Sequence, residues 1–148
     1  MIVVDASLAV KWLFREADTP EAFDFLQRHR GALVAPELIF IEVAGVIVRR
    51  ANEIQSYRDD ALDTARLWER TYSEQGIKGF RLTPRRLATA STMALTIRHP
   101  LKDCFYVALA RELNCELATC DVKLRDKASS FYPNIRLLAD YSAPLSSA

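Results

Sequence analysis

Short runs of aliphatic residues recur along the chain and predict buried β-strands. The first run, Ile-Val-Val at residues 2–4, is followed directly by Asp5. This first run is apolar at consecutive positions, which is typical of a parallel strand that is covered on both faces. Strands are expected at residues 2–4, 32–35, 79–82, 117–120 and 135–138.

Longer segments between these runs have the spacing of amphipathic helices. Thr19-Pro20 and Thr83-Pro84 each place an N-cap residue before a first-turn proline, which indicates where two of the helices begin. In the segment 57–74, Leu62, Ala65 and Trp68 mark the apolar side. Helices are expected at residues 7–14, 19–30, 36–52, 57–74, 84–97 and 101–113.

This alternation of strands and helices predicts an α/β fold, a three-layer α/β/α sandwich around a central, mostly parallel sheet. A chain of 148 residues fits one domain and is long enough to bury a substantial core. No repeat or change of composition marks a boundary, so residues 1–141 are expected to form a single domain. Residues 142–148 are small and polar and are expected to be a frayed tail.

The composition argues against several classes of protein. With only four glycines in 148 residues, a Gly-rich nucleotide-binding loop is not expected. No apolar run approaches the roughly 20 residues that span a bilayer, and the N-terminal segment carries an acid and no basic leader, unlike a signal peptide. A net charge of +1 provides no global basic field, so nucleic-acid binding would have to come from a local patch or from a metal.

The three cysteines, Cys104, Cys115 and Cys120, form no C-x-x-C pair. The two histidines, His29 and His99, are poorly placed to complete a zinc site with them. We therefore expect reduced, core-packing cysteines in a cytoplasmic protein that makes no membrane contact.

Two acids follow predicted strands directly. Asp5 ends the first strand and Asp121 ends the strand 117–120, and the carboxyl ends of parallel strands are where α/β proteins bind ligands. Helix capping is the alternative role for both, since Asp5 or Ser7 suits the N-cap of the helix that follows, and Asp121 suits the same position before residues 122–127. Asp126 lies between basic neighbours and is expected to be solvated.

Two further acids lie on apolar helix faces. Glu42 shares its face with Ile39 and Val46 and has no lysine or arginine three or four residues away. Such a carboxylate must be partnered, protonated or bound to a cation. The alternatives are that it reaches solvent or pairs with a distant arginine. Asp103 shares its face with Val107, and its alternative role is favourable electrostatics at a helix N-terminus.

The four acids together are harder to explain by these alternatives than each acid is alone. Four carboxylates that meet at one sheet edge would repel strongly without a divalent cation between them. A ligand set made only of oxygen atoms suits Mg²⁺ or Mn²⁺ rather than Zn²⁺. Sites of this kind are typical of phosphodiester hydrolysis.

The order of these motifs resembles the PIN domain and, more narrowly, the VapC-like toxins of bacterial toxin–antitoxin modules. The resemblance runs from Met1 to about Leu138, and its most specific part is the segment 103–121. The D-A-S sequence at residues 5–7 would by itself be weak evidence for the resemblance. The chain carries V-V-D-A-S at residues 3–7, P-E at 36–37, Glu42, H-P-L-K-D-C-F-Y-V-A-L-A at 99–110 and L-A-T-C-D at 117–121.

This resemblance implies a Mg²⁺-dependent endoribonuclease whose catalytic acids are Asp5, Glu42, Asp103 and Asp121. Asp5 and Asp103 match the positions most directly linked to the metal, whereas the separate roles of Glu42 and Asp121, as further metal ligands or as holders of the water, stay open. Ser7 and Thr119 match hydroxyl positions that flank the acids. The resemblance also implies an RNA substrate, a homodimer and a cognate antitoxin whose C-terminal segment fills the site.

Basic and aromatic residues are weaker candidates for RNA contacts. Basic side chains near the site edge would meet phosphates, although solvated surface is the more common role. Trp12, Phe105 and Tyr106 offer rings for base stacking, but core packing is favoured for each. The basic candidates are Lys11, Arg85, Arg86, Lys102 and Lys123.

Other functions fit the sequence less well. A haloacid-dehalogenase-like phosphatase would need a second aspartate where Ser7 stands, and a response-regulator receiver would need adjacent acids at the end of the first strand. The non-enzymatic alternative is a PIN-fold module that binds RNA or protein without significant nuclease activity. The four acids count against it, since a silent site has no need to bury unpaired charge.

Overall fold

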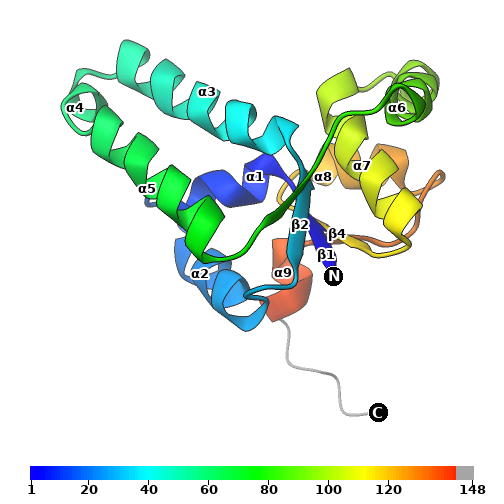
Figure 1. The fold of residues 1–148 in the computed structure, drawn as a ribbon, viewed down its shortest axis with the longest axis horizontal. Helices are drawn as coiled ribbons and strands as arrows, with labels where there is room; N and C mark the ends of the chain where they lie inside the picture. The colour runs from blue at the N-terminus through cyan, green and yellow to red at the C-terminus, as the bar shows by residue number, and fades with distance from the viewer. Residues whose placement is uncertain (143–148) are drawn as a thin grey trace.

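The computed structural model describes residues 1–142, which form a five-stranded sheet with the order β3-β2-β1-β4-β5. Every neighbouring pair of strands is parallel. The expected α/β/α fold is therefore confirmed (Figure 1). The strands are β1 (Ile2–Val4), β2 (Leu33–Pro36), β3 (Lys78–Phe80), β4 (Glu116–Thr119) and β5 (Ile135–Leu137).

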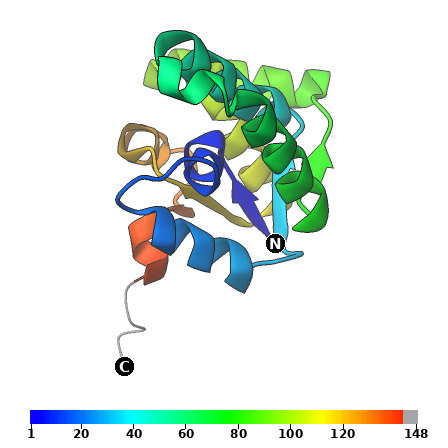
Figure 2. The same cartoon turned by 90° about the vertical axis from the view of Figure 1, so that its left-hand side faces the viewer.

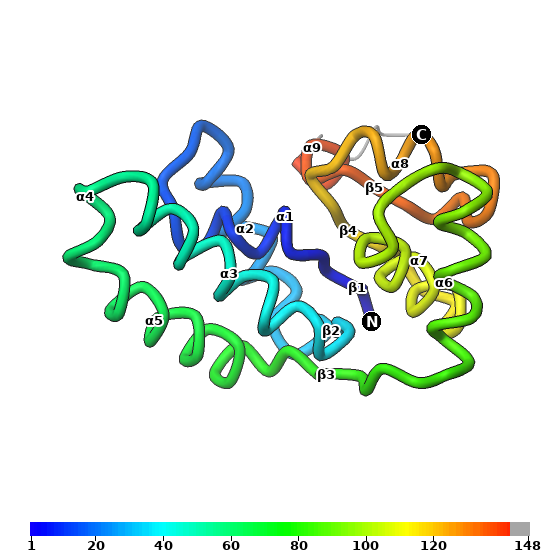
Figure 3. The backbone as a smooth tube through the Cα atoms, turned by 90° about the horizontal axis from the view of Figure 1, so that it is seen from above, coloured from blue at the N-terminus to red at the C-terminus, as the bar shows by residue number. Residues whose placement is uncertain are grey.

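Helices lie on both sides of this sheet (Figure 3). On one side are α1 (Ala6–Ala9), the 3₁₀ helix η1 (Val10–Trp12), α2 (Thr19–Arg28), α3 (Leu38–Glu53), α4 (Gln55–Arg58) and α5 (Ala61–Glu74). On the other side are α6 (Pro84–Ile97), α7 (Leu101–Leu113) and α8 (Val122–Ala128). A last helix, α9 (Leu138–Ser142), packs beside α2 (Figure 2).

The sheet reverses its winding direction between β1 and β4. From β1 the chain moves outward through β2 to β3, and it then crosses back to β4 and β5 with its helices on the opposite face. Val4 pairs with Ala118 in this register, so the carboxyl ends of β1 and β4 lie next to each other. A reversal of this kind opens a crevice at the carboxyl edge, which is where open α/β sheets bind ligands.

Helix α7 is buried along most of its length. Its residues 104–110 are all buried, because α7 lies between α6 and strands β1, β2 and β4. A helix that is apolar around its whole circumference is stable only when neighbours cover every side. Phe105 and Tyr106 are therefore core residues, as expected, and so is Trp12. The first turn of α7 is fixed against the sheet edge by this packing.

Several sequence-based expectations need correction. The helix expected at 57–74 is interrupted at Asp59 and Asp60, since aspartate favours caps and turns over helix interiors. On its apolar side only Trp68 is buried, whereas Leu62 is 73% exposed and Ala65 is also exposed. Helix α9 was not expected. It ends at Ser142, and the rest of the expected frayed tail lies outside the described residues.

No helix among residues 1–142 combines the length and apolar character that a membrane crossing requires.

Candidate active site

A pocket of about 630 Å³ lies at the carboxyl edge of the sheet and brings the four expected acids together. Asp5 follows β1, Glu42 lies on α3, Asp103 lies in the first turn of α7, and Asp121 follows β4. Four segments that are distant in sequence thus place a carboxylate in one cavity. The other lining residues are Ala6, Ser7, Val10, Lys11, Glu16, Gly45, Val46, Arg49, Arg50, Lys102, Tyr106 and Cys120.

Asp5 is the one acid of the four that is fully buried, with 5% of its surface exposed. Its Oδ1 accepts from the Ser7 hydroxyl at 2.7 Å and from the Leu8 backbone N–H at 3.2 Å, and its Oδ2 accepts from the Thr119 hydroxyl. Asp5 is thus also the N-cap of α1, so the capping role proposed as an alternative is compatible with a place in the pocket.

The pKa of Asp5 is raised to about 6 because burial disfavours the charged carboxylate. The hydrogen bonds from Thr119, Ser7 and Leu8 oppose this shift, while the negative charge of Asp103 adds to it. Burial also raises the pKa of Asp103 itself. The pocket therefore holds carboxylates whose charge is under-compensated by the protein alone.

Ser7 and Thr119 connect the two strand ends through their hydroxyl groups. Ser7 Oγ accepts from the Cys120 N–H at 2.9 Å, and Thr119 Oγ1 accepts from the Asp121 N–H, also at 2.9 Å. Asp121 in turn caps α8 by accepting from the Leu124 N–H at 2.9 Å. The two hydroxyls thus fix the Asp5 carboxylate and the backbone that carries Asp121 as one unit.

Glu42 has partners that the sequence did not indicate. The Tyr106 hydroxyl donates a hydrogen bond to its Oε2, and Lys102 Nζ lies 2.9 Å from its Oε1. The contact with Glu42 raises the pKa of Lys102, and burial raises the pKa of Tyr106. The carboxylate is thus neutralised by a lysine from α7 rather than by a distant arginine, and its side chain is only 10% exposed.

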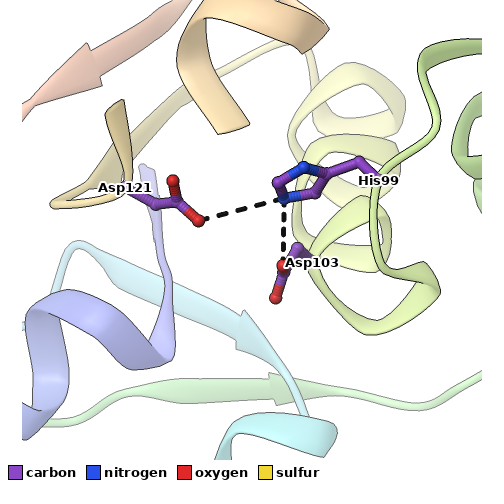
Figure 4. Close-up of side chains that lie close together, drawn as sticks. All are labelled: His99, Asp103 and Asp121. Atoms are coloured by element: carbon purple, nitrogen blue, oxygen red, sulfur yellow. Dashed lines mark ion pairs between the residues drawn. The ribbon is translucent and has the colours of Figure 1, made fainter. Parts of the chain in front are cut away.

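His99 lies beside two of the pocket acids, Asp103 and Asp121, and sequence reasoning did not propose it as a site residue (Figure 4). Its Nε2 lies 3.0 Å from an Asp103 oxygen and 3.9 Å from an Asp121 oxygen, and the three side chains could hold one ion. The only available signal was its place four residues before Asp103 in the H-P-L-K-D motif. The expected ligand set, made only of oxygen atoms, therefore omitted a nitrogen within reach.

The pocket offers donor atoms for a divalent cation, and among residues 1–142 the three side chains whose ligand atoms lie within 4.8 Å of one another are His99, Asp103 and Asp121. Carboxylates from Asp5 and Asp103 are hard oxygen ligands of the kind that Mg²⁺ and Mn²⁺ accept. Their raised pKa values indicate negative charge that lacks full compensation. A bound cation would supply the missing positive charge.

The expected RNA-binding residues divide into two groups. Lys11 and Lys102 line the pocket, but Lys11 is paired with Glu16 and Asp18, each at 2.8 Å. Arg49 and Arg50 on α3 also line it and were not expected. Outside the pocket lie Lys123, which is exposed on α8, and Arg85 and Arg86, which line a separate hollow between α6 and α7.

Arg86 needs the clearest correction. It is 5% exposed, it donates to the Arg81 carbonyl, and its Nε lies 3.0 Å from Glu112. A guanidinium held in this way serves α6–α7 packing and is not free to meet a phosphate.

Cysteine chemistry does not contribute to the site. All three cysteines, which lie in the described part of the chain, are free thiols. Burial raises the pKa of Cys120, the one that lines the pocket, to about 12. A thiol that stays protonated is not a nucleophile.

Comparisons with known proteins identify one family model and solved structures of similar fold. The family model described as PIN domain matches residues 2–129. PAE2754 from Pyrobaculum aerophilum has a similar fold, with a TM-score of 0.74 at 19% identity over 95% of this chain and 90% of that chain. VapC20 from Mycobacterium tuberculosis, a toxin that cleaves the sarcin–ricin loop, has a TM-score of 0.67 at 14% identity over 84% of this chain and 92% of that chain.

Among curated proteins no significant sequence match was found. The family model nevertheless covers most of the described residues, from β1 to the end of α8. The chain belongs to the PIN domain family.

Proposed function

We propose that the chain is a divalent-metal-dependent endoribonuclease. One observation carries this proposal: four acids from four separate segments line a single pocket at the sheet's reversal point, and one of them, Asp5, is buried with a raised pKa. Membership of the PIN family supports a nuclease. The RNA specificity of VapC20 supports RNA as the substrate class.

In this mechanism water attacks an RNA phosphate in line, the P–O3′ bond breaks, and the products carry a 5′-phosphate and a 3′-hydroxyl. Mg²⁺ or Mn²⁺ held by Asp5 and Asp103 would supply a water of lowered pKa and positive charge at the phosphate. Ser7 and Thr119 keep the Asp5 carboxylate in one orientation. Glu42 and Asp121 are the remaining carboxylates that can orient the water or complete the metal coordination.

Basic residues around the pocket provide the phosphate contacts. Arg49 is exposed and lines the pocket, and Lys102 is 62% exposed although it pairs with Glu42. If Lys102 left Glu42 to contact a substrate phosphate, RNA binding would free the Glu42 carboxylate from its ion pair. Lys11 is held by two acids and is the weaker candidate.

The test is cleavage of RNA by the purified protein with Asp5→Asn, which keeps the size and removes the charge. We expect the cleavage rate to fall by more than about 100-fold. Loss of a residue that only supports a metal ligand typically lowers activity by about 10- to 100-fold, and loss of the ligand itself should lower it at least as much. Asp126→Asn is the matched control, since Asp126 is exposed and lies outside the pocket. Wild-type cleavage by Asp5→Asn would refute the proposal.

The biological role proposed is that of the toxin in a bacterial toxin–antitoxin pair, acting in the cytoplasm. The cognate antitoxin would fill the acidic pocket with its C-terminal segment. A homodimer is also proposed, and exposed apolar side chains on α3 and α5, including Ile41, Val48 and Leu62, support an interface there. Support for the toxin role comes from the fold shared with VapC20.

A binding module without nuclease activity is the second candidate. The ion pair between Lys102 and Glu42 favours it, because this pair offsets part of the pocket's charge without a cation. Thermal unfolding with and without Mg²⁺ or Mn²⁺ separates the two functions. A bound ion at 100 times its Kd adds about 2.7 kcal/mol of stability, whereas no shift at millimolar metal would favour the module.

A further inference from the structure

The imidazole of His99 is buried at the pocket without a hydrogen-bond partner. Its side chain is 7% exposed, and within residues 1–142 its Nε2 satisfies no hydrogen bond. Asp103 Oδ2 lies only 3.0 Å away, but the geometry of this contact is not that of a hydrogen bond. A buried polar atom in this state is unusual, because leaving such a group unpaired is costly.

The ring points at two carboxylates rather than at apolar surface. Figure 4 shows Nε2 turned toward both Asp103 and Asp121. One ligand atom from each of the three residues lies within 4.8 Å of the others. An ion with bonds of about 2.1 Å has neighbouring ligands about 3 Å apart and opposite ligands about 4.2 Å apart. The separations of 3.0 Å and 3.9 Å from Nε2 fall in this interval.

The backbone holds these three groups in place before any ion arrives. His99 lies between Arg98, which ends α6 in a left-handed conformation with φ 53°, and Pro100, whose ring fixes its own φ. Asp103 lies in the first turn of the buried helix α7. Asp121 uses Oδ1 to cap α8, while its Oδ2 is the oxygen nearest His99.

We propose that His99, Asp103 and Asp121 form a mixed nitrogen–oxygen site that makes this pocket prefer a first-row transition-metal ion to Mg²⁺. The inference rests on the proposed function in one respect, that the pocket binds a divalent cation. Mg²⁺ takes oxygen ligands and retains its waters, whereas imidazole nitrogen is a ligand of transition-metal ions. A single nitrogen donor therefore changes the order of affinities that four carboxylates would give.

The experiment uses Mn²⁺ as the probe and electron spin echo modulation as the readout, because the modulation detects a nitrogen bound directly to the ion. The protein is loaded with one equivalent of Mn²⁺ in three forms: wild type, His99→Gln and His29→Gln. His29 is the matched control, since its Nε2 is also buried and unpartnered within residues 1–142, but it packs against Phe25 and Tyr141. Wild-type protein labelled with ¹⁵N-histidine provides the same test without a substitution.

We expect ¹⁴N modulation in the wild type and in His29→Gln, and its loss in His99→Gln and in the ¹⁵N-histidine sample. The Mn²⁺ affinity of His99→Gln should fall at least about tenfold, and its Mg²⁺ affinity less than about threefold. Mn²⁺ bound without a histidine signal in the wild type would overturn the inference and assign His99 to an ion pair. Equal losses of Mn²⁺ and Mg²⁺ affinity would also overturn it.

Failure of this inference is distinguishable from failure of the proposed function. RNA cleavage that depends on Asp5 and on added metal, together with Mn²⁺ bound through oxygen alone, would leave the nuclease proposal intact. Absence of any divalent-ion binding would refute both.

Discussion

Asp5 combines three roles that usually fall to different residues. It ends a buried strand, caps the helix that follows, and carries a charge in a largely desolvated position. The hydroxyls of Ser7 and Thr119 lower the cost of that charge without removing it, since the pKa still lies well above its ordinary value. Stability in the absence of metal should therefore depend on whether Asp5 is protonated.

The first prediction concerns this pH dependence in the presence of a chelator. Because the folded-state pKa is raised from 3.8 to about 6, the folded protein retains a proton that the unfolded chain loses. The contribution of Asp5 to stability is thus greatest below about pH 4 and falls by about 3 kcal/mol as pH rises from about 4 through 6. Urea unfolding at several pH values measures this slope.

Asp5→Asn keeps the helix cap but removes the titrating carboxyl group. The contribution of Asp5 should therefore disappear from the dependence of the unfolding free energy on pH. Asp126→Asn should retain it. An unchanged slope in Asp5→Asn would mean that burial does not shift the pKa of this carboxyl.

A second prediction concerns Thr119, which is fully buried. Thr119→Val keeps the shape but removes the donor to Asp5 and the acceptor for the Asp121 N–H. We expect a loss of about 1–3 kcal/mol in the free energy of unfolding and a fall of about 10- to 100-fold in metal affinity. Thr119→Ser should lose much less metal affinity, and similar losses in both variants would contradict the role of the hydroxyl.

At the residue scale, the sequence was sufficient to place acids but not their partners. Asp5 and Asp121 follow strands, and the ends of neighbouring parallel strands must meet. The contact of Lys102 with Glu42 and that of His99 with Asp121 were missed, because both depend on how the start of α7 lies against α3 and the sheet edge. Spacing along one helix does not determine contacts of that kind.

At the scale of elements, α3 and α5 form an antiparallel pair that projects from the sheet (Figure 1). Trp68 attaches α5 to α3: it is 2% exposed, and its indole N–H donates to the Phe40 carbonyl at 3.2 Å. The strands and most helices could be predicted because their apolar periodicity agrees with their local end signals. The break at Asp59 and Asp60 was missed because apolar spacing continues across it.

The third prediction tests this attachment. Trp68→Ala should cost about 3–5 kcal/mol in the free energy of unfolding, as expected for loss of a large buried aromatic side chain. Leu62→Ala, on the same helix but 73% exposed, should change it by less than about 0.5 kcal/mol. Chemical denaturation followed by circular dichroism measures both. Equal effects would show that α5 is held through its exposed face as well.

At the scale of the whole molecule, the reversal of the sheet between β1 and β4 explains why the pocket lies at the carboxyl edge there. The α3–α5 pair, in turn, offers apolar surface for a second copy of the chain. Ile41 on α3 is 72% exposed, and it lines a hollow with Phe40 and Tyr72. Exposed apolar side chains that lie close together are typical of interaction sites.

The fourth prediction is that the wild-type protein sediments with about twice the 16.8 kDa mass of one chain. Ile41→Lys should shift it toward the monomer, because a charge would be buried at the interface. Leu95→Lys is the matched control, since Leu95 is 82% exposed on α6, away from the α3–α5 pair. A monomeric wild type, or equal effects of both variants, would contradict the proposed interface.

The central claim is that the pocket acids share a divalent ion. Anomalous diffraction from crystals grown with Mn²⁺ tests this claim most directly. The account predicts an anomalous peak within about 2.0–2.6 Å of carboxylate oxygens of Asp5 and Asp103. It also predicts that the peak is absent from crystals of Asp5→Asn grown in the same way. Well-diffracting wild-type crystals with saturating Mn²⁺ and no peak in this pocket would contradict the account.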